Sequence, residues 1–250
     1  MTDEEQRKTD AAIRPPDLEW LDGDVPRAEG FDDTYFSKAG GLAETRHVFL
    51  SGNDLPNRFS GRKAFTIAEF GFGTGLNFLA TLLALKDVNP APALTFVSFE
   101  LRPMTADQLL RALAAFPELG ELPGLLADVW EPKPGWSIMT VGGAQLVLGT
   151  GDARLLIGDF RDQTAAPFLD RPMPPVDAWF LDGFSPAKNP ELWDAELLKS
   201  AADLTADDGS LATYTAAGWV RRNLQTAGFE INKVKGYAGK REMVVGRKTA

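Results

Sequence analysis

The chain has 250 residues, of which 44% are hydrophobic and 24% charged, proportions typical of a soluble globular protein with one main core. It has no cysteine and one histidine, which excludes disulfides, thiolate metal sites, a cysteine nucleophile and zinc sites built on two or three histidines, so we expect no metal. The net charge of −9 argues against indiscriminate polyanion binding, and the lack of a long apolar run or signal-like start predicts a cytoplasmic protein with no membrane partner.

Three segments are predicted along the chain. Residues 1–16 are polar and end in Pro-Pro, which predicts a disordered tail. Residues 17–62 begin with LEWLDGDVPRAEGFDDTYFS, whose short apolar runs are interrupted by Asp-Gly and Pro, as in a small β-hairpin. We expect this segment to be a lid in which Tyr35, Phe36 and Ser37 close over a ligand. Residues 63–250 form the main domain.

The main domain alternates strands with helices. Strands are predicted at 65–70, 94–100, 176–182, 210–215, 229–236 and 242–246, and a hairpin closed by Gly142-Gly143 at 137–152. Helices are predicted at 76–85 and 105–116, and from about residues 190 and 218. This order predicts an α/β, Rossmann-like fold: a doubly wound, mostly parallel sheet with an N-terminal β lid and a small β-hairpin insertion. Ligands of such sheets bind at the carboxyl ends of the strands.

A glycine-rich turn joins the first strand to the first helix. The strand ends at Glu69, and Gly71, Gly73 and Gly75 follow, which lets the backbone turn tightly against a ligand. Leu76 stands where a dinucleotide-binding turn requires its last glycine, and Leu76-Asn77 replaces the Lys-Ser/Thr of a phosphate loop. An acidic residue before the glycines suits a positively charged ligand, so we predict an S-adenosylmethionine site. Its candidate residues in this turn are Glu69, Gly71, Gly73, Gly75 and Asn77. A glycine-rich turn without a ligand is the alternative.

Two further acidic residues end neighbouring strands. Glu100 follows LTFVSF, where a carboxylate can accept both ribose hydroxyls of the cofactor. Asp152 follows the predicted hairpin and is the candidate for the adenine amino group. Asp159 is its rival, but Leu156 and Phe160 fall at helical spacing behind Asp152, which favours Asp152.

The stretch WFLDGFSPAKNPELW gives the candidate catalytic residues. Asp182 ends a buried strand, and Phe184 and Pro186 follow. The stretch resembles the Asp/Asn-Pro-Pro-aromatic loop of amino-methyltransferases, in which an acidic or amide side chain holds the target nitrogen and an aromatic ring stacks on the substrate. Gly183 here replaces the first proline. The alternative for Asp182 is an N-cap of the next helix.

The chain as a whole resembles the tRNA methyltransferases that make 5-methylaminomethyl-2-thiouridine, either free-standing or as half of the bifunctional MnmC family. The matching stretches run from about Leu18 to Gly246 and include FDDTYFS, EFGFGTGLNFL, VDAWFLDGFSPAKNPELW, TYTAAGWVRRNLQTAGF and GYAGKREMVVG. Longer members continue into an FAD-dependent oxidase. This chain stops at Ala250, so we expect no fused oxidase module. His47 stands where family members carry an aromatic residue, and we expect it to be structural.

The resemblance implies methylation, from S-adenosylmethionine, of the 5-aminomethyl group of the wobble (2-thio)uridine of tRNA. Asp182 would orient the amine and accept its proton, and Phe184 would stack on the flipped base. The last 32 residues carry eight Lys/Arg and two Glu, a local charge of +6 on an acidic body. They supply most of the candidate tRNA contacts: Lys188, Arg221, Arg222, Lys240 and Arg241. The alternatives are a small-molecule amine methyltransferase, which would not need this basic end, and a non-catalytic nucleotide-binding protein.

Overall fold

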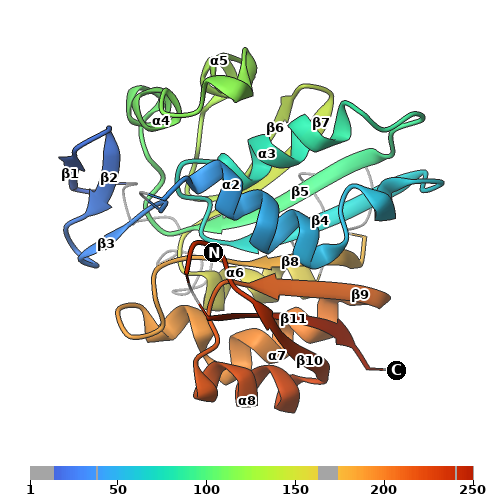
Figure 1. The fold of residues 1–250 in the computed structure, drawn as a ribbon. Coiled ribbons are helices and arrows are strands. Elements are labelled where there is room, and N and C mark those ends of the chain that lie inside the picture. The colour runs from blue at the N-terminus through green and yellow to red at the C-terminus, as the bar shows by residue number, and fades with distance from the viewer. Residues whose placement is uncertain (1–13, 38, 163–173, 240, 250) are drawn as a thin grey trace, which may run out of the picture.

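The computed structural model describes residues 14–37, 39–162, 174–239 and 241–249. Most of the predicted tail therefore lies outside the described residues. An eight-stranded sheet forms the centre of the molecule and a three-stranded sheet lies at its N-terminal side (Figure 1). No helix in the described part of the chain is long and apolar enough to cross a membrane.

The central sheet has the order β10-β11-β9-β8-β4-β5-β7-β6. Its strands are β4 Ala64–Phe70, β5 Ala93–Glu100, β6 Gly135–Val141, β7 Ala144–Thr150, β8 Val176–Leu181, β9 Thr205–Thr213, β10 Phe229–Lys235 and β11 Glu242–Lys248. The five strands from β9 to β7 pair in parallel, and the edge strands add antiparallel pairs. The predicted doubly wound, mostly parallel sheet and its β6–β7 hairpin are confirmed.

Helices cover both faces of this sheet, because side chains along its strands alternate between two apolar cores. On β4, Phe65 and Ile67 enter one core and Ala68 and Phe70 the other. The first core holds α3 Leu76–Leu85, α4 Ala106–Leu113 and α5 Leu122–Val129. The second holds α6 Ala153–Arg161, α7 Ala195–Leu204 and α8 Gly218–Ala227. The sequence pattern had not indicated α5.

The N-terminal segment is a β lid only in its first half. Strands β1 Leu18–Leu21, β2 Val25–Ala28 and β3 Asp33–Thr34 form the small antiparallel sheet. The next stretch is helical: α2 Gly41–Thr45, η1 Arg46–Leu50, η2 Ser51–Asn53 and η3 Asn57–Phe59. Phe49 stacks on Phe180 of β8 with ring centroids 5.4 Å apart, and Asn53 Nδ2 donates to the Trp179 carbonyl at 3.2 Å. These helices are therefore part of the packing of the central sheet.

The strand order of the sheet reverses between β4 and β8. The helix that follows β4 and the helix that follows β8 lie on opposite faces of the sheet. Neighbouring parallel strands with oppositely directed crossovers leave a crevice beyond their carboxyl ends. The glycine-rich turn follows β4, Glu100 ends β5, and Asp182 follows β8. The fold therefore brings three of the predicted site segments to one edge of the sheet.

Candidate active site

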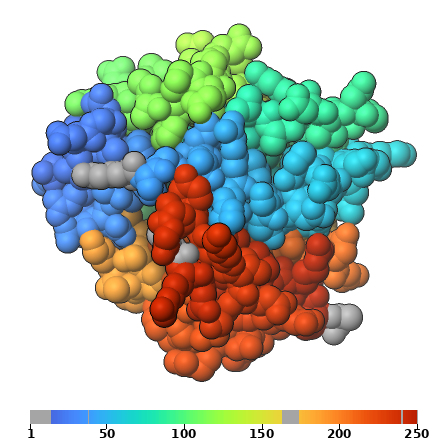
Figure 2. Space-filling view, in the orientation of Figure 1, coloured from blue at the N-terminus to red at the C-terminus, as the bar shows by residue number. Residues whose placement is uncertain are grey.

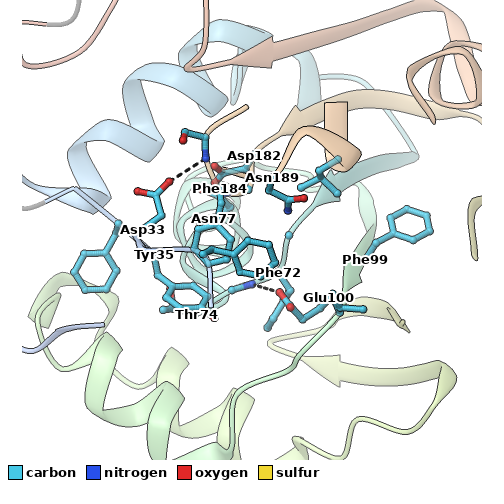
Figure 3. Close-up of a pocket in the computed structure, with 18 of the residues that line it drawn as sticks. Asp33, Tyr35, Phe72, Thr74, Asn77, Phe99, Glu100, Asp182, Phe184 and Asn189 are labelled. Carbon is cyan, nitrogen blue, oxygen red and sulfur yellow. Dashed lines mark hydrogen bonds between the residues drawn. The ribbon is translucent and has the colours of Figure 1, made fainter. Parts of the chain in front are cut away.

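A cavity of about 750 Å³ opens at this edge (Figure 3). Its lining comes from the N-terminal segment, the turn after β4, the end of β5, the start of α6, and the loop after β8. Segments from the two ends of the chain also meet nearby: Tyr237 donates its hydroxyl to the Ala39 carbonyl at 3.1 Å, and His47 Nε2 lies 2.9 Å from the Lys235 carbonyl. The close approach of N-terminal and C-terminal segments is visible in Figure 2. His47 does not line the cavity.

The turn after β4 allows two loops to approach each other closely. Gly71 has φ +81°, and a Cβ placed on it would lie 3.2 Å from the Gly183 Cα in the loop after β8. A Cβ on Gly73 would lie 3.0 Å from the ring of Tyr35. Gly71 and Gly73 line the cavity, whereas Gly75 accommodates the ring of Phe72 and lies outside its lining.

Glu100 holds the glycine turn from the end of β5. Its Oε2 accepts from the Gly73 N–H at 2.9 Å and its Oε1 from the Arg102 N–H at 2.8 Å (Figure 3). Burial raises the pKa of Glu100, and these backbone donors oppose the rise. Each carboxylate oxygen has a second lone pair, so Glu100 can still accept from a ligand hydroxyl.

Asp152 lies in the cavity wall and Asp159 does not line it. Asp152 is the N-cap of α6, with Oδ1 accepting from the Arg154 N–H at 2.9 Å. Its side chain also binds the Arg154 guanidinium at 2.6 Å, which lowers the pKa of Asp152. Asp152 caps a helix and pairs with an arginine, and its oxygens keep some capacity to accept a further hydrogen bond. Its contact with the adenine amino group stays a prediction.

Glu69 lies beneath the cavity and does not line it. The side chain is fully buried on β4, a central strand of the sheet. Its Oε1 accepts from Ser98 Oγ at 2.9 Å and its Oε2 from Asn77 Nδ2 at 3.2 Å. Burial raises the pKa of Glu69 well above its usual range, and the charge of Asp182 adds to the rise. In this structure Glu69 has no direct access to a cofactor.

Asn77 lines the cavity and joins the two carboxylates. Its Nδ2 donates to Asp182 Oδ2 at 2.8 Å as well as to Glu69. Its Oδ1 accepts from Thr45 Oγ1 at 2.9 Å. Both N–H donors of the amide are thus used within the protein, which differs from the direct cofactor contact that the sequence had suggested.

The loop after β8 is held on several sides. Tyr214, which follows β9, donates its hydroxyl to the Gly183 carbonyl at 2.9 Å, and Trp193 Nε1 donates to the Phe184 carbonyl at 3.1 Å. Burial raises the pKa of Tyr214, and the charge of Asp182 adds to it, so this hydroxyl stays a donor. The loop continues into the 3-10 helix η6 Pro190–Trp193, whose N-cap position is Asn189, and Asp194 caps α7, so Asp182 caps neither helix. Asp182 instead faces the cavity (Figure 3).

The N-terminal lid packs on the loop after β8. The Phe31 ring stacks on Phe184 with centroids 4.7 Å apart, and Tyr35 meets Phe184 edge-on at 5.1 Å. Asp33 Oδ2 accepts from the Ser185 N–H at 2.9 Å. Tyr35 thus lies over both the glycine turn and the loop after β8, and one face of Phe184 is already covered.

The predicted tRNA-contact residues come from three parts of the chain. Lys188 binds the carbonyl of Asp32 in the lid. Arg221 and Arg222 are on α8, where Arg222 is exposed and Arg221 half-buried. Arg241 is exposed just before β11, and Lys240 lies outside the described residues. None of the described members of this set lines the cavity.

Several lining residues were not predicted from the sequence: Asp33, Glu44, Thr45, Asn189, Glu191 and Tyr214. Asp33 and Tyr214 occur in FDDTYFS and TYTAAGW, two of the stretches that carry the family resemblance. That resemblance is the only sequence feature that points to them as site residues. Glu44 and Thr45 belong to a helical turn in the part that was predicted to be a β lid.

The charges of the cavity indicate what it can hold. Six carboxylate side chains line it, against one described cation, Arg154, which is paired with Asp152. A pyrophosphate would face this negative field without a compensating cation. S-adenosylmethionine carries a sulfonium and an ammonium and no phosphate, so the donors and the glycine cradle fit it. Among the described residues no cluster of metal-binding side chains is present.

Comparison with known proteins agrees with this fit. A family model described as S-adenosyl-L-methionine-dependent methyltransferase matches residues 126–249. The chain is 44% identical over 240 residues to the tRNA 5-methylaminomethyl-2-thiouridine biosynthesis bifunctional protein MnmC of Aeromonas hydrophila, covering 92% of this chain and 35% of that protein. It is 43% identical over 240 residues to the same protein of Stutzerimonas stutzeri, covering 94% and 35%. The chain therefore spans about a third of the length of these relatives.

One solved structure shares the fold over almost the whole chain. The crystal structure of MnmC2 from Aquifex aeolicus superimposes with a TM-score of 0.67 at 22% sequence identity, and the match covers 99% of this chain and 78% of that one. The extent of the match includes the N-terminal segment, so the lid is part of the shared architecture.

Proposed function

Because the chain belongs to the S-adenosyl-L-methionine-dependent methyltransferases of the MnmC type, we propose that it methylates the 5-aminomethyl group of the tRNA wobble uridine, giving 5-methylaminomethyl-(2-thio)uridine. The observation that carries this proposal is the position of Asp182, in an acidic cavity and next to the glycine turn. The relatives are named for biosynthesis of this nucleoside.

The cofactor is held by the half of the cavity that the glycine turn borders. Gly71 and Gly73 leave room for it, Glu100 accepts from its ribose hydroxyls, and Asp152 accepts from its adenine amino group. When bound, S-adenosylmethionine supplies a methyl group on a positively charged sulfur, which a free amine can take up. Glu69 lies beneath the cavity wall and contacts the site through its hydrogen bond with Asn77.

Asp182 has to make the amine available. An alkyl ammonium has a pKa near about 10, so presenting the free amine at pH 7 costs about 4 kcal/mol. The Asp182 carboxylate orients the nitrogen through a hydrogen bond and takes the proton that the nitrogen loses. A carboxylate also stabilises the ammonium form, so we rank orientation first and proton acceptance second.

Aromatic rings receive the base. Anticodon bases are recognised unstacked, between aromatic side chains. Phe184 lies two residues after Asp182 and borders the cavity, so it is the wall for the uridine ring. Phe31 and Tyr35 pack on Phe184 and complete an aromatic group that belongs partly to the lid.

The function is tested with labelled S-adenosylmethionine and tRNA that carries the unmethylated aminomethyl uridine. We expect the label in 5-methylaminomethyl-(2-thio)uridine after nucleoside analysis. Calorimetry should show binding of S-adenosylmethionine and none of NAD. Tight NAD binding without S-adenosylmethionine binding would reject the cofactor assignment, and label transfer to free aminomethyl nucleoside as efficient as to tRNA would favour the small-molecule alternative.

Neutralising exposed cations of the basic end should weaken the salt dependence of the tRNA KM. Arg222→Gln combined with Arg241→Gln removes two exposed charges, and the slope of log KM against log salt should fall by roughly 0.7–0.9 for each phosphate that is no longer bound. The measurement is the KM for tRNA at several salt concentrations.

A matched control removes two exposed charges from the opposite edge of the sheet. Lys63 precedes β4 and Lys86 follows α3, so both are remote from the cavity along these elements. Lys63→Gln with Lys86→Gln should leave the slope unchanged. Equal slopes for the two double variants would show that the basic end is only solvated surface.

A further inference from the structure

Polar side chains form a continuous hydrogen-bonded series that runs from beneath the cavity into its wall. It starts at Ser98 on β5, passes through Glu69 on β4 and Asn77 on α3, and ends at Asp182 after β8. Thr45 joins it from the side, on α2. The links are 2.8–3.2 Å long, so each is a hydrogen bond of ordinary length. Figure 3 shows Asn77 below Asp182.

Asn77 is the link through which this series reaches Asp182. A primary amide has two N–H donors that diverge in one plane, and here they go to two different carboxylates. The opposite amide orientation would turn the amide oxygen toward the Asp182 carboxylate, which is repulsive. The Thr45 hydroxyl, itself buried, donates to Oδ1 and selects the orientation with the donors on the carboxylates.

Glu69 has no packing reason to be a carboxylate. It is fully buried in the central strand, and its described hydrogen-bond partners are the hydroxyl of Ser98 and the amide of Asn77, neither of them a cation. Burying a carboxyl is costly, and an apolar side chain would fill the same space. The rise in its pKa is caused in part by Asp182, so the two carboxyls interact electrostatically as well as through the shared amide. The contacts of Glu69 thus lead toward the site.

We propose that Asn77, oriented by Thr45 and anchored on Glu69, is a positioning residue that holds the Asp182 carboxylate in the orientation from which it engages the acceptor amine. The inference rests on the proposed role of Asp182. It replaces a direct contact of Asn77 with the cofactor, since both N–H donors of the amide are already used. A carboxylate displaced by about 1 Å loses a large part of the benefit of orientation, of the order of 100-fold in rate.

The first test compares single-turnover rates at saturating cofactor and tRNA. Asn77→Ala should lower the rate about 10- to 100-fold and change the cofactor Kd, measured by calorimetry, by less than about 3-fold. Thr45→Val removes only the hydroxyl and should also lower the rate, whereas Thr45→Ser keeps the donor and should restore most of what Thr45→Val loses. Circular dichroism will show whether Asn77→Ala folds. If it does not, the comparison of Thr45→Val with Thr45→Ser still tests whether the orientation of Asn77 affects the rate.

The second test is a double-mutant cycle with Asp182→Ala. If Asn77 acts through Asp182, Asn77→Ala should have no further effect on the rate of the Asp182→Ala protein. Additive losses would overturn the inference and leave the role of Asp182 intact. A weakened cofactor Kd with an unchanged single-turnover rate would overturn it in favour of direct cofactor binding. Equal rates for Thr45→Ser and Thr45→Val would also overturn it. A wild-type rate in Asp182→Ala would reject the proposed chemistry itself, a distinct outcome.

Discussion

Asp182→Asn should lower the single-turnover rate of methyl transfer at pH 7 by 10²- to 10⁴-fold, the usual contribution of a positioned base. Asparagine keeps the shape and can still accept from Asn77 through its carbonyl, so the loop after β8 should keep its position. What is lost is the negative charge that orients the amine and takes its proton. Binding of cofactor and tRNA should persist.

The pH dependence distinguishes the two parts of this role. If orientation dominates, the rate of the variant should rise between pH 6 and 9, up to tenfold per unit, because the fraction of free amine rises in that way. If proton acceptance dominates, the loss should be closer to 10⁴-fold and recover less. Asp194→Asn is the matched control, since Asp194 is exposed, lies outside the cavity lining and caps α7, where asparagine serves equally well. Wild-type rates in Asp182→Asn at every pH would remove this residue from the mechanism.

Gly71→Ala should abolish most cofactor binding. The residue has φ +81°, and the added methyl would lie 3.2 Å from the backbone of Gly183, which cannot rotate away as a side chain does. The alanine therefore pushes the glycine turn and the loop after β8 apart, and we expect the Kd for S-adenosylmethionine to rise more than tenfold. Calorimetry measures the effect directly.

Gly61→Ala separates this clash from backbone strain. Gly61 has φ +73° but nothing within 4 Å of its Cβ position. Both substitutions should cost about 1–2 kcal/mol of folding free energy, because both place an alanine in the left-handed region. Only Gly71→Ala should lose cofactor affinity. Equal affinities in the two proteins would mean that the approach of these loops does not shape the site.

Local sequence signals predicted the sheet and much of the cavity edge. The turn with Gly71 and Gly73, the strand end at Glu100 and the loop at Asp182 are each readable, because parallel strands deliver their carboxyl ends to one edge. The direction in which a side chain points is not readable in this way. Glu69 and Glu100 both lie at the carboxyl ends of apolar strands, yet one is buried beneath the wall and the other lines it.

Tertiary contacts decided the rest. Residues 41–59 contain Gly52 and Pro56, which interrupt any long helix, and the short helical turns form where Phe49 and Asn53 pack on β8. The role of Asn77 depends on Thr45, Glu69 and Asp182, which come from three other elements 8 to 105 residues away in the chain. The spacing of residues within one motif carries no information about hydrogen bonds between side chains of separate elements.

The stack of Phe31 on Phe184 has a consequence for how a nucleotide enters. A uridine that uses this face of Phe184 must displace Phe31, so entry is an exchange of one ring stack for another. The ring pair that separates and the base–ring pair that forms are of similar energy, about 1 kcal/mol or a little more. An exchange of this kind keeps the apolar face covered both before and after the base arrives. Substrate arrival and lid release then become a single event.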